Sequence, residues 1–315
     1  MISTLYQIIR TARVRQWLKN FSLFAAPVFS GLLFSGDTFT LSLKAFFAFC
    51  AVSSGSYFVN DIVDVPKDQL HPIKKNRPIA SGKLSIKLAK TIAVLLLAGS
   101  LAYSYCCVGR YFFFALLSYL LMQLAYSYYF RNVIILDSLV VATGFVIRVF
   151  AGAFASNTSV SSWLALTTIG ISMLLAFGKR RSEKTLLQKY YGEDIERDTR
   201  KTLRHYPDSL LDSMISMSAT YAIITYSLFT FHVSPRLSSK IIIGFLPSVL
   251  RNPKIMMITI PLVIYGVARY LYIIYEKKEG ESPERLFLSD KPMLSVVSLW
   301  AVFTLLIMYV LPLFT

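Results

Sequence analysis

Apolar stretches recur along nearly the whole chain, and each is close to the twenty residues that a helix needs to cross a membrane. Short polar or basic segments separate them. A window of that length predicts nine spans, at residues 17–36, 39–60, 86–107, 111–130, 133–155, 161–179, 209–232, 255–276 and 292–313. This pattern indicates an all-α, polytopic membrane protein.

Composition agrees with this class. The 315 residues are 55% hydrophobic, and the mean hydropathy is +0.55. A water-soluble core cannot bury that much apolar surface, so the bilayer must be the solvent for most of the chain. The three cysteines and three histidines lack the spacing of a zinc site.

Basic residues predict the orientation. Most of the 33 lysines and arginines fall in alternate connections, beginning with the amino-terminal segment. The positive-inside rule then places the amino terminus in the cytoplasm and the carboxyl terminus outside an inner (cell) membrane. The net charge of +16 reflects topology and an attraction for anionic lipids and substrates. We therefore expect membrane lipids rather than nucleic acid as partners.

One domain, residues 1–315, accounts for the chain. Residues 3–16 are basic and amphipathic, which predicts an interfacial helix before the first span. The connections at 61–85 and 180–208 are the long cytoplasmic ones and carry most of the acidic residues. We expect these two loops to cap an active site on the cytoplasmic face.

An acidic motif closes the second span. Asn60, Asp64 and Asp68 recur at four-residue steps, and Asp61 lies one position around the helix, within about 100° of the same face. Pro66 should kink or end the helix there, because it lacks an N–H group and clashes with the preceding turn. Carboxylates this close repel one another unless a hard cation intervenes. The motif predicts a magnesium–diphosphate site; the alternative is a solvated acidic helix end balanced by nearby lysines.

Basic and amide side chains are predicted on the same membrane face, where they could hold phosphate groups. Each lysine or arginine taken alone could instead be an interfacial anchor whose charge reaches the lipid headgroups. Their convergence with the acidic motif favours substrate binding. The candidates are Gln16, Lys19, Asn20, Arg77, Lys179 and Arg180.

The acidic motif, followed by the string Asn-Arg-Pro-Ile-Ala-Ser-Gly at 76–82, resembles the first aspartate-rich motif of the UbiA superfamily of intramembrane prenyltransferases. The resemblance covers most of the chain and implies nine transmembrane helices around a central cavity. It also implies that Asp61, Asp64 and Asp68 are catalytic and bind Mg²⁺, with Asn60 as a positioning donor.

Three further segments, 13–20, 137–152 and 178–183, are similar to the phosphoribosyltransferase branch of that superfamily. This likeness implies that 5-phosphoribose passes from phosphoribosyl diphosphate to a polyprenyl (decaprenyl-like) phosphate, with release of diphosphate. The acceptor oxygen is already anionic, so the enzyme must neutralise charge and align two phosphorylated substrates rather than supply a strong base.

The loop after the sixth predicted span leaves an alternative open. Asp194 and Asp198 have the four-residue spacing of a second aspartate motif, typical of the aromatic and quinone-precursor prenyltransferases that use a prenyl diphosphate. We interpret them as a mainly solvated face, with Glu183, Arg200 and Tyr206 closer to a sugar phosphate. A transporter is a third hypothesis. Transporters usually carry ions at the bilayer midplane, whereas most of the charge here lies in the cytoplasmic connections.

Two charges, Asp137 and Arg148, fall within the fifth predicted span, about three turns apart on one helix face. Charges at that depth are costly and usually face a protein interior or a cavity. They could line the cavity, or each could pair with a neighbouring span and fix the packing.

Overall fold

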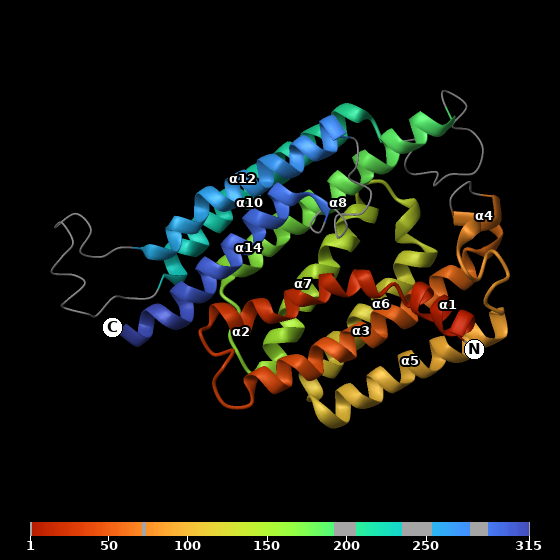
Figure 1. The fold of residues 1–315 in the computed structure, drawn as a ribbon, viewed down its shortest axis with the longest axis horizontal. Helices are drawn as coiled ribbons and strands as arrows, with labels where there is room; N and C mark the ends of the chain where they lie inside the picture. The colour runs from red at the N-terminus through yellow and green to blue at the C-terminus, as the bar shows by residue number, and fades with distance from the viewer. Residues whose placement is uncertain (1, 71–73, 192–205, 235–253, 278–288, 315) are drawn as a thin grey trace.

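The structure is a computed structural model, and it describes residues 2–70, 74–191, 206–234, 254–277 and 289–314. Within these ranges every regular element is a helix (Figure 1), which confirms the all-α prediction. Six single helices are long and apolar enough to cross a membrane: α3 (Thr38–Val63), α5 (Ile86–Cys107), α6 (Arg110–Tyr128), α7 (Leu136–Ser156), α8 (Ser162–Tyr191) and α10 (Asp208–Val233).

Two further spans are composite helices. One joins η5 (Ile255–Thr259), α12 (Ile260–Tyr272) and η6 (Ile273–Lys277), and the other joins α14 (Lys291–Leu305), η7 (Leu306–Val310) and η8 (Leu311–Phe314). The described ranges therefore contain eight helices that satisfy both length and composition for a span. The predicted count of nine is not confirmed.

The missing span is the first one predicted, at 17–36. The chain there forms a 3-10 helix, η1 (Val14–Phe24), followed by the short helix α2 (Ala25–Phe29). Turns follow α2, and Gly31 has the positive φ of 73° that favours glycine. The apolar run is thus divided between two short helices and a turn.

The predicted interfacial helix at 3–16 is also shorter than expected. Helix α1 (Ile2–Ala12) ends at Ala12 because Arg13 takes the left-handed conformation, with φ 53° and ψ 50°. A left-handed residue cannot continue a right-handed helix. The arginine therefore separates α1 from η1, and its side chain points to the acidic motif described below.

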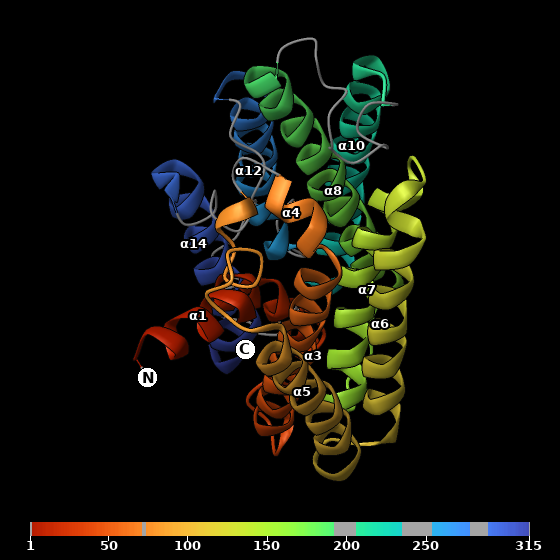
Figure 2. The same cartoon turned by 90° about the vertical axis from the view of Figure 1, so that its right-hand side faces the viewer.

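Consecutive helices pack on one another (Figures 1 and 2). Helix α7 lies between α6 and α8 and also contacts η1 and α3. The last span returns to the segment around α2: Trp300 packs on Phe29 with ring centroids 6.3 Å apart, and the Tyr309 hydroxyl donates to the Val28 carbonyl at 2.9 Å. These contacts join the last span to the segment that follows η1.

Local chemistry explains several helix ends. Ser85 caps α5, where its hydroxyl accepts a hydrogen bond from the Leu88 N–H at 3.3 Å. Asp290 caps α14 in the same way through the Met293 N–H at 3.1 Å. Gly109, with φ 148°, allows the tight turn between α5 and α6 that few other residues could form.

The predicted break near Pro66 is confirmed, but it lasts one residue. Helix α3 ends at Val63, Asp64 follows it, and α4 (Val65–Leu70) begins at the next residue, with the Asp68 N–H donating to the Asp64 carbonyl at 2.8 Å. The expected loop 61–85 therefore begins as helix and also contains the 3-10 turn η2 (Lys74–Asn76).

The second expected loop, 180–208, also begins as helix, because α8 extends to Tyr191. Residues 180–191 contain neither proline nor glycine and are rich in good helix formers, so nothing stops the helix at the end of the apolar run. Asp194, Asp198 and Arg200 lie outside the described residues.

Candidate active site

Two carboxylates of the acidic motif meet at one guanidinium. Arg77 Nη1 donates to Asp68 Oδ2 at 2.7 Å and to Asp61 Oδ1 at 3.2 Å. Arg13 Nη2 donates to the same Asp61 oxygen. The two aspartates are only 3% and 4% exposed, whereas Arg13 and Arg77 keep 25% and 26% of their side-chain surface exposed. Two buried carboxylates are thus paired with arginines that still contact water. We call Arg13, Asp61, Asp68 and Arg77 the Asp61 cluster.

Asn60 and Asp64 bond residues at the end of α6 and just after it, rather than the Asp61 cluster. The Ser127 hydroxyl on α6 donates to Asn60 Oδ1, and Arg131 Nη1 donates to both Asp64 oxygens at 2.9 and 3.0 Å. Arg131 belongs to η3 (Phe130–Asn132). Positions four apart share one helix face, as do positions seven apart. The expected single convergence is therefore divided between two faces.

The arrangement can be tested against Mg²⁺, which typically takes one or two carboxylates and completes its shell with water and phosphate oxygens. Asp61 and Asp68 fit that role, because their oxygens already converge on one cationic nitrogen. No three Asp, Glu, His or Cys side chains gather around one point in the described ranges. Metal binding by Asp64 stays a prediction.

Burial raises the pKa of Asp68 above its usual value, and the nearby Asp61 and Asp64 charges add to the increase. The Arg77 guanidinium lowers the same pKa and offsets part of it. Such a carboxylate needs positive charge beside it to remain ionised. The Asp61 cluster is therefore a place where either an arginine or a bound cation is required.

The residues before the first predicted span lie beside this cluster. The Arg13 guanidinium stacks on the Tyr57 ring, 4.8 Å from its centroid, and the Tyr57 hydroxyl donates to Gln16 Oε1. Lys19 Nζ donates to the same Gln16 oxygen at 3.2 Å. Gln16 and Lys19 are thus linked to the Asp61 cluster through Tyr57 and Arg13, and their binding of substrate stays a prediction.

Arg180 lies in a separate buried network. Its Nε is 2.6 Å from Asp137 Oδ2, its Nη1 donates to Glu183 Oε2 at 2.6 Å, and its Nη2 donates to the Tyr126 hydroxyl at 2.9 Å. Arg180 is 2% exposed and Asp137 is fully buried. All three guanidinium nitrogens lie within 3 Å of protein oxygens and the side chain is buried, so this arginine is not presented to a ligand. Lys179, in contrast, is one-third exposed and lies 3.8 Å from Glu183.

Tyr206 joins the same network rather than a substrate pocket. Its hydroxyl donates to Asp137 Oδ1 at 2.6 Å and accepts from the Ile135 N–H. Burial raises the pKa of Tyr206 to about 12, and the Asp137 carboxylate adds to the increase. Lys184 Nζ donates to the Tyr206 carbonyl at 2.6 Å. These bonds fix the chain just before α10 onto the α6–α7 connection.

Asn20 holds Arg148 inside the helix bundle. Arg148 Nε donates to Asn20 Oδ1, Nη1 to the Gly144 carbonyl and Nη2 to the Tyr119 hydroxyl, each at 2.8 Å. Asn20 is 1% exposed. For both Asp137 and Arg148, the structure shows the packing alternative: Asp137 pairs with α8, and Arg148 ties α7 to η1 and α6.

Sequence reasoning missed Arg13 and Arg131 as partners of the acidic motif. Arg13 was visible within the basic string that carries the family resemblance, whereas Arg131 was visible only as a topology signal. Tyr57 and Tyr126 gave no signal that separates them from the other 17 tyrosines of the 19 in the chain.

The UbiA prenyltransferase family model matches residues 24–290. The chain belongs to the UbiA prenyltransferase family. It is therefore a multi-pass membrane transferase, and the match includes the acidic motif and the helices that carry it.

Two named relatives of the UbiA family are similar over most of the chain. A decaprenyl-phosphate phosphoribosyltransferase from Corynebacterium glutamicum is 30% identical over 98% of this chain and 88% of its own length. A protein of the same name from Mycolicibacterium smegmatis is 35% identical over 71% of this chain and 70% of its own. Among solved structures, a UbiA homologue from Archaeoglobus fulgidus bound to DMAPP and Mg²⁺ superposes with a TM-score of 0.68 and 18% identity, covering 96% of this chain and 99% of that one. The last comparison establishes the fold.

Proposed function

We propose that this protein transfers 5-phosphoribose from phosphoribosyl diphosphate to a polyprenyl phosphate and releases diphosphate. The observation that carries the proposal is the similarity, over 98% and 71% of this chain, to two proteins named decaprenyl-phosphate phosphoribosyltransferase. The Asp61 cluster supports it, because buried carboxylates under exchangeable arginines suit a metal-bound diphosphate.

Asp61 and Asp68 would hold Mg²⁺ at the end of α3, and Asp64 would join them after release from Arg131. Bound Mg²⁺ would neutralise the leaving diphosphate. The arginines displaced from the carboxylates, Arg13 and Arg77, are then close enough to cover the same diphosphate. Opening these pairs alone would leave two buried carboxylates without a positive partner, so we expect the arginines to leave only as Mg²⁺ takes their place.

Lys19 and Gln16, from η1, and Lys179, from α8, would position the remaining phosphates: the 5-phosphate of the donor and the phosphate of the lipid. Both reacting groups are anions, so alignment and charge neutralisation supply most of the rate. Asn20, Arg180 and Tyr206 are buried. We therefore assign them to support of the site, with Glu183 as the direct partner of Arg180.

The proposal includes the sidedness of the site. An amino terminus in the cytoplasm and a carboxyl terminus outside would put the segments 61–85 and 180–208 at the cytoplasmic surface, as caps of a single domain. Water-soluble phosphoribosyl diphosphate would then reach the Asp61 cluster directly, while the lipid acceptor would approach through the membrane.

A donor-exchange assay tests the proposal. Purified protein in lipid is incubated either with a polyprenyl phosphate and labelled phosphoribosyl diphosphate, or with an aromatic acceptor and a labelled prenyl diphosphate, each with Mg²⁺ and with EDTA. We expect label from the sugar donor to enter the lipid phase only with Mg²⁺. Transfer from the prenyl diphosphate to an aromatic acceptor, with none from the sugar donor, would instead establish the aromatic prenyltransferase alternative.

A further inference from the structure

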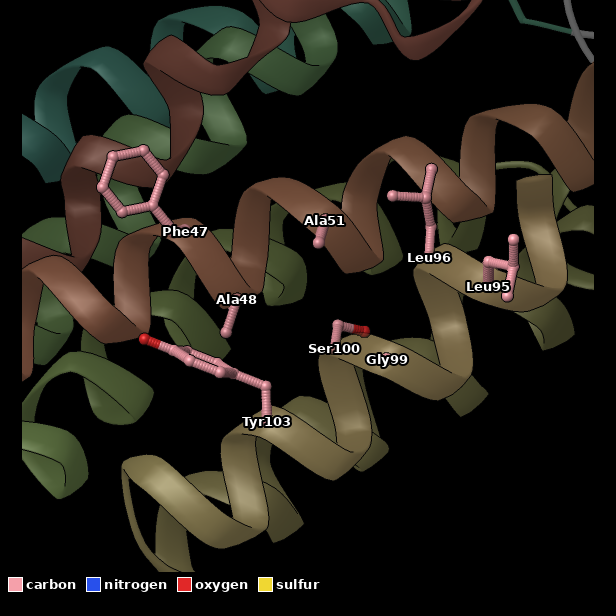
Figure 3. Close-up of a pocket in the computed structure, with 8 residues that line it drawn as sticks. All are labelled: Phe47, Ala48, Ala51, Leu95, Leu96, Gly99, Ser100 and Tyr103. Carbon is pink, nitrogen blue, oxygen red and sulfur yellow. The ribbon is translucent and has the colours of Figure 1, made fainter.

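An apolar groove runs along the outer side of the pair α3 and α5. Its volume is about 320 Å³, and Figure 3 shows Ala48 and Ala51 of α3 opposite Ser100 and Tyr103 of α5. The groove exists because the facing side chains are small. At Gly99, an added Cβ would meet no atom within 4 Å, so the space in front of this residue is open.

A second groove of about 320 Å³ continues the first toward the acidic motif. The two share Phe47, Ala51 and Leu96, so they form one path. The second groove also reaches Ala12 and Val14, the residues on either side of Arg13. The path thus begins beside the arginine that pairs with Asp61 and ends at the level of Tyr103; we call it the α3–α5 groove.

The position of the α3–α5 groove determines what can fill it. Along α3 it extends from Phe58 to Phe47, which is roughly 16 Å at 1.5 Å per residue, about half the thickness of the hydrocarbon core. Both helices are membrane spans, and the lining is almost entirely apolar. A hydrocarbon chain that enters at the membrane surface suits such a groove.

The mouth of the groove carries positive charge. Arg10, Arg13 and Arg15 alternate along the chain with Ile9, Ala12 and Val14, which line it. A ligand with an anionic head and an apolar tail would therefore place its head among these arginines and its tail between α3 and α5. A polyprenyl phosphate has this form, and its phosphate would lie next to the Asp61 cluster.

We propose that the α3–α5 groove binds the first isoprenoid units of the lipid acceptor and so aims its phosphate at the donor. The inference rests on the proposed function and adds a tail-binding path to it. Membrane lipid is as apolar as the groove, so binding there gains little from the hydrophobic effect. The groove acts through shape and orientation.

A matched pair of substitutions tests the groove. Gly99→Trp fills it, whereas Ala98→Trp adds the same bulk at the neighbouring exposed position of α5, which does not line it. We expect Gly99→Trp to raise the KM for decaprenyl phosphate about tenfold and to leave the KM for phosphoribosyl diphosphate and the melting temperature unchanged. Ala98→Trp should match wild type. Equal acceptor kinetics in the two variants would overturn the inference.

Photo-crosslinking tests binding without turnover. A polyprenyl phosphate with a diazirine in its early isoprenoid units should label α3 and α5, and excess unlabelled polyprenyl phosphate should suppress the labelling while phosphatidylglycerol does not. Labelling confined to other helices, or equal competition by phosphatidylglycerol, would contradict the groove as an acceptor site. Because this readout needs no donor, failure of the groove remains distinguishable from failure of the proposed transfer reaction.

Discussion

Two groups of arginine and aspartate, built from the same chemistry, lie in very different surroundings. In the Asp61 cluster, Arg77 bonds Asp61 and Asp68 while about a quarter of its side chain stays exposed. In the second group, Arg180 bonds Asp137 and Glu183 with only 2% of its side chain exposed. The first group is at the end of α3, and the second joins α6, α7 and α8 inside the protein.

Burial decides what each group can do. A buried ion pair has lost its water, so removal of one partner leaves an uncompensated charge in the protein interior. In the Asp61 cluster the aspartates are buried too, but the arginines keep their contact with water, so a bound cation can take their place beside the carboxylates. We infer that the Asp61 cluster exchanges its arginines for substrate, and that the Arg180 network holds the fold beneath the site.

The largest expected effect comes from breaking the buried network. Arg180→Ala should lower the free energy of unfolding by about 3–5 kcal/mol, because it leaves Asp137 charged and unpaired. Arg181→Ala is the matched control, since Arg181 pairs with the partly exposed Asp208 and Asp212. Denaturant titration of both variants in detergent measures the difference; equal stability would show that burial does not separate the two groups.

The Asp61 cluster should respond in the opposite way. Asp61→Asn should lower turnover on the order of 100-fold or more, because it removes charge that holds the donor, while the melting temperature changes little. Asp37→Asn, at an exposed aspartate before α3, serves as the control and should retain the wild-type rate. Wild-type turnover in Asp61→Asn would exclude the assigned role, and a collapse of its stability would make the cluster structural.

Tyr206 gives the buried network a signature at high pH. Its pKa is raised to about 12, so the folded protein keeps the hydroxyl protonated where the unfolded chain, near pH 10, loses the proton. The stability that this hydroxyl contributes is complete below pH 10 and is lost as the pH rises toward 12. Tyr206→Phe should remove this dependence in unfolding curves measured across that range. An unchanged dependence would place its origin in another group.

The smallest effect is expected at Arg131, which pairs with Asp64. Arg131→Gln should cost less stability than Arg180→Ala, because Arg131 and Asp64 keep 14% and 17% of their side-chain surface exposed and Arg180 only 2%. If Asp64 joins the metal, the substitution also removes a competitor, and the Mg²⁺ concentration for half-maximal activity should fall severalfold. A Mg²⁺ titration of the rate checks this, and an increase would show that Arg131 itself binds substrate.

The features that depend on neighbouring residues in the sequence could be predicted from the sequence. The spacing of Asp61 and Asp68, the break at Pro66 and most span positions follow from helix geometry and apolar periodicity. The hydrogen-bond partners of these polar side chains do not follow from such local rules. Asn20 appeared to be a substrate ligand, yet it holds Arg148, 128 residues away in the chain.

The same limit applies to the arginines. Lysines and arginines at a membrane surface look alike in sequence, so Arg180 resembled Lys179. Only the packing of α7 on α8 buries Arg180 against Asp137. Likewise, the left-handed turn at Arg13 joins residues 48 positions apart, and no periodic signal predicts it.

A donor-binding measurement tests whether Mg²⁺ and Asp61 together hold phosphoribosyl diphosphate. Binding of labelled phosphoribosyl diphosphate to the purified protein is measured with Mg²⁺ and with EDTA, for wild type, Asp61→Asn and Asp37→Asn. The account predicts Mg²⁺-dependent binding to wild type and Asp37→Asn, and its loss in Asp61→Asn. Binding that survives in Asp61→Asn, or that persists in EDTA, would contradict it.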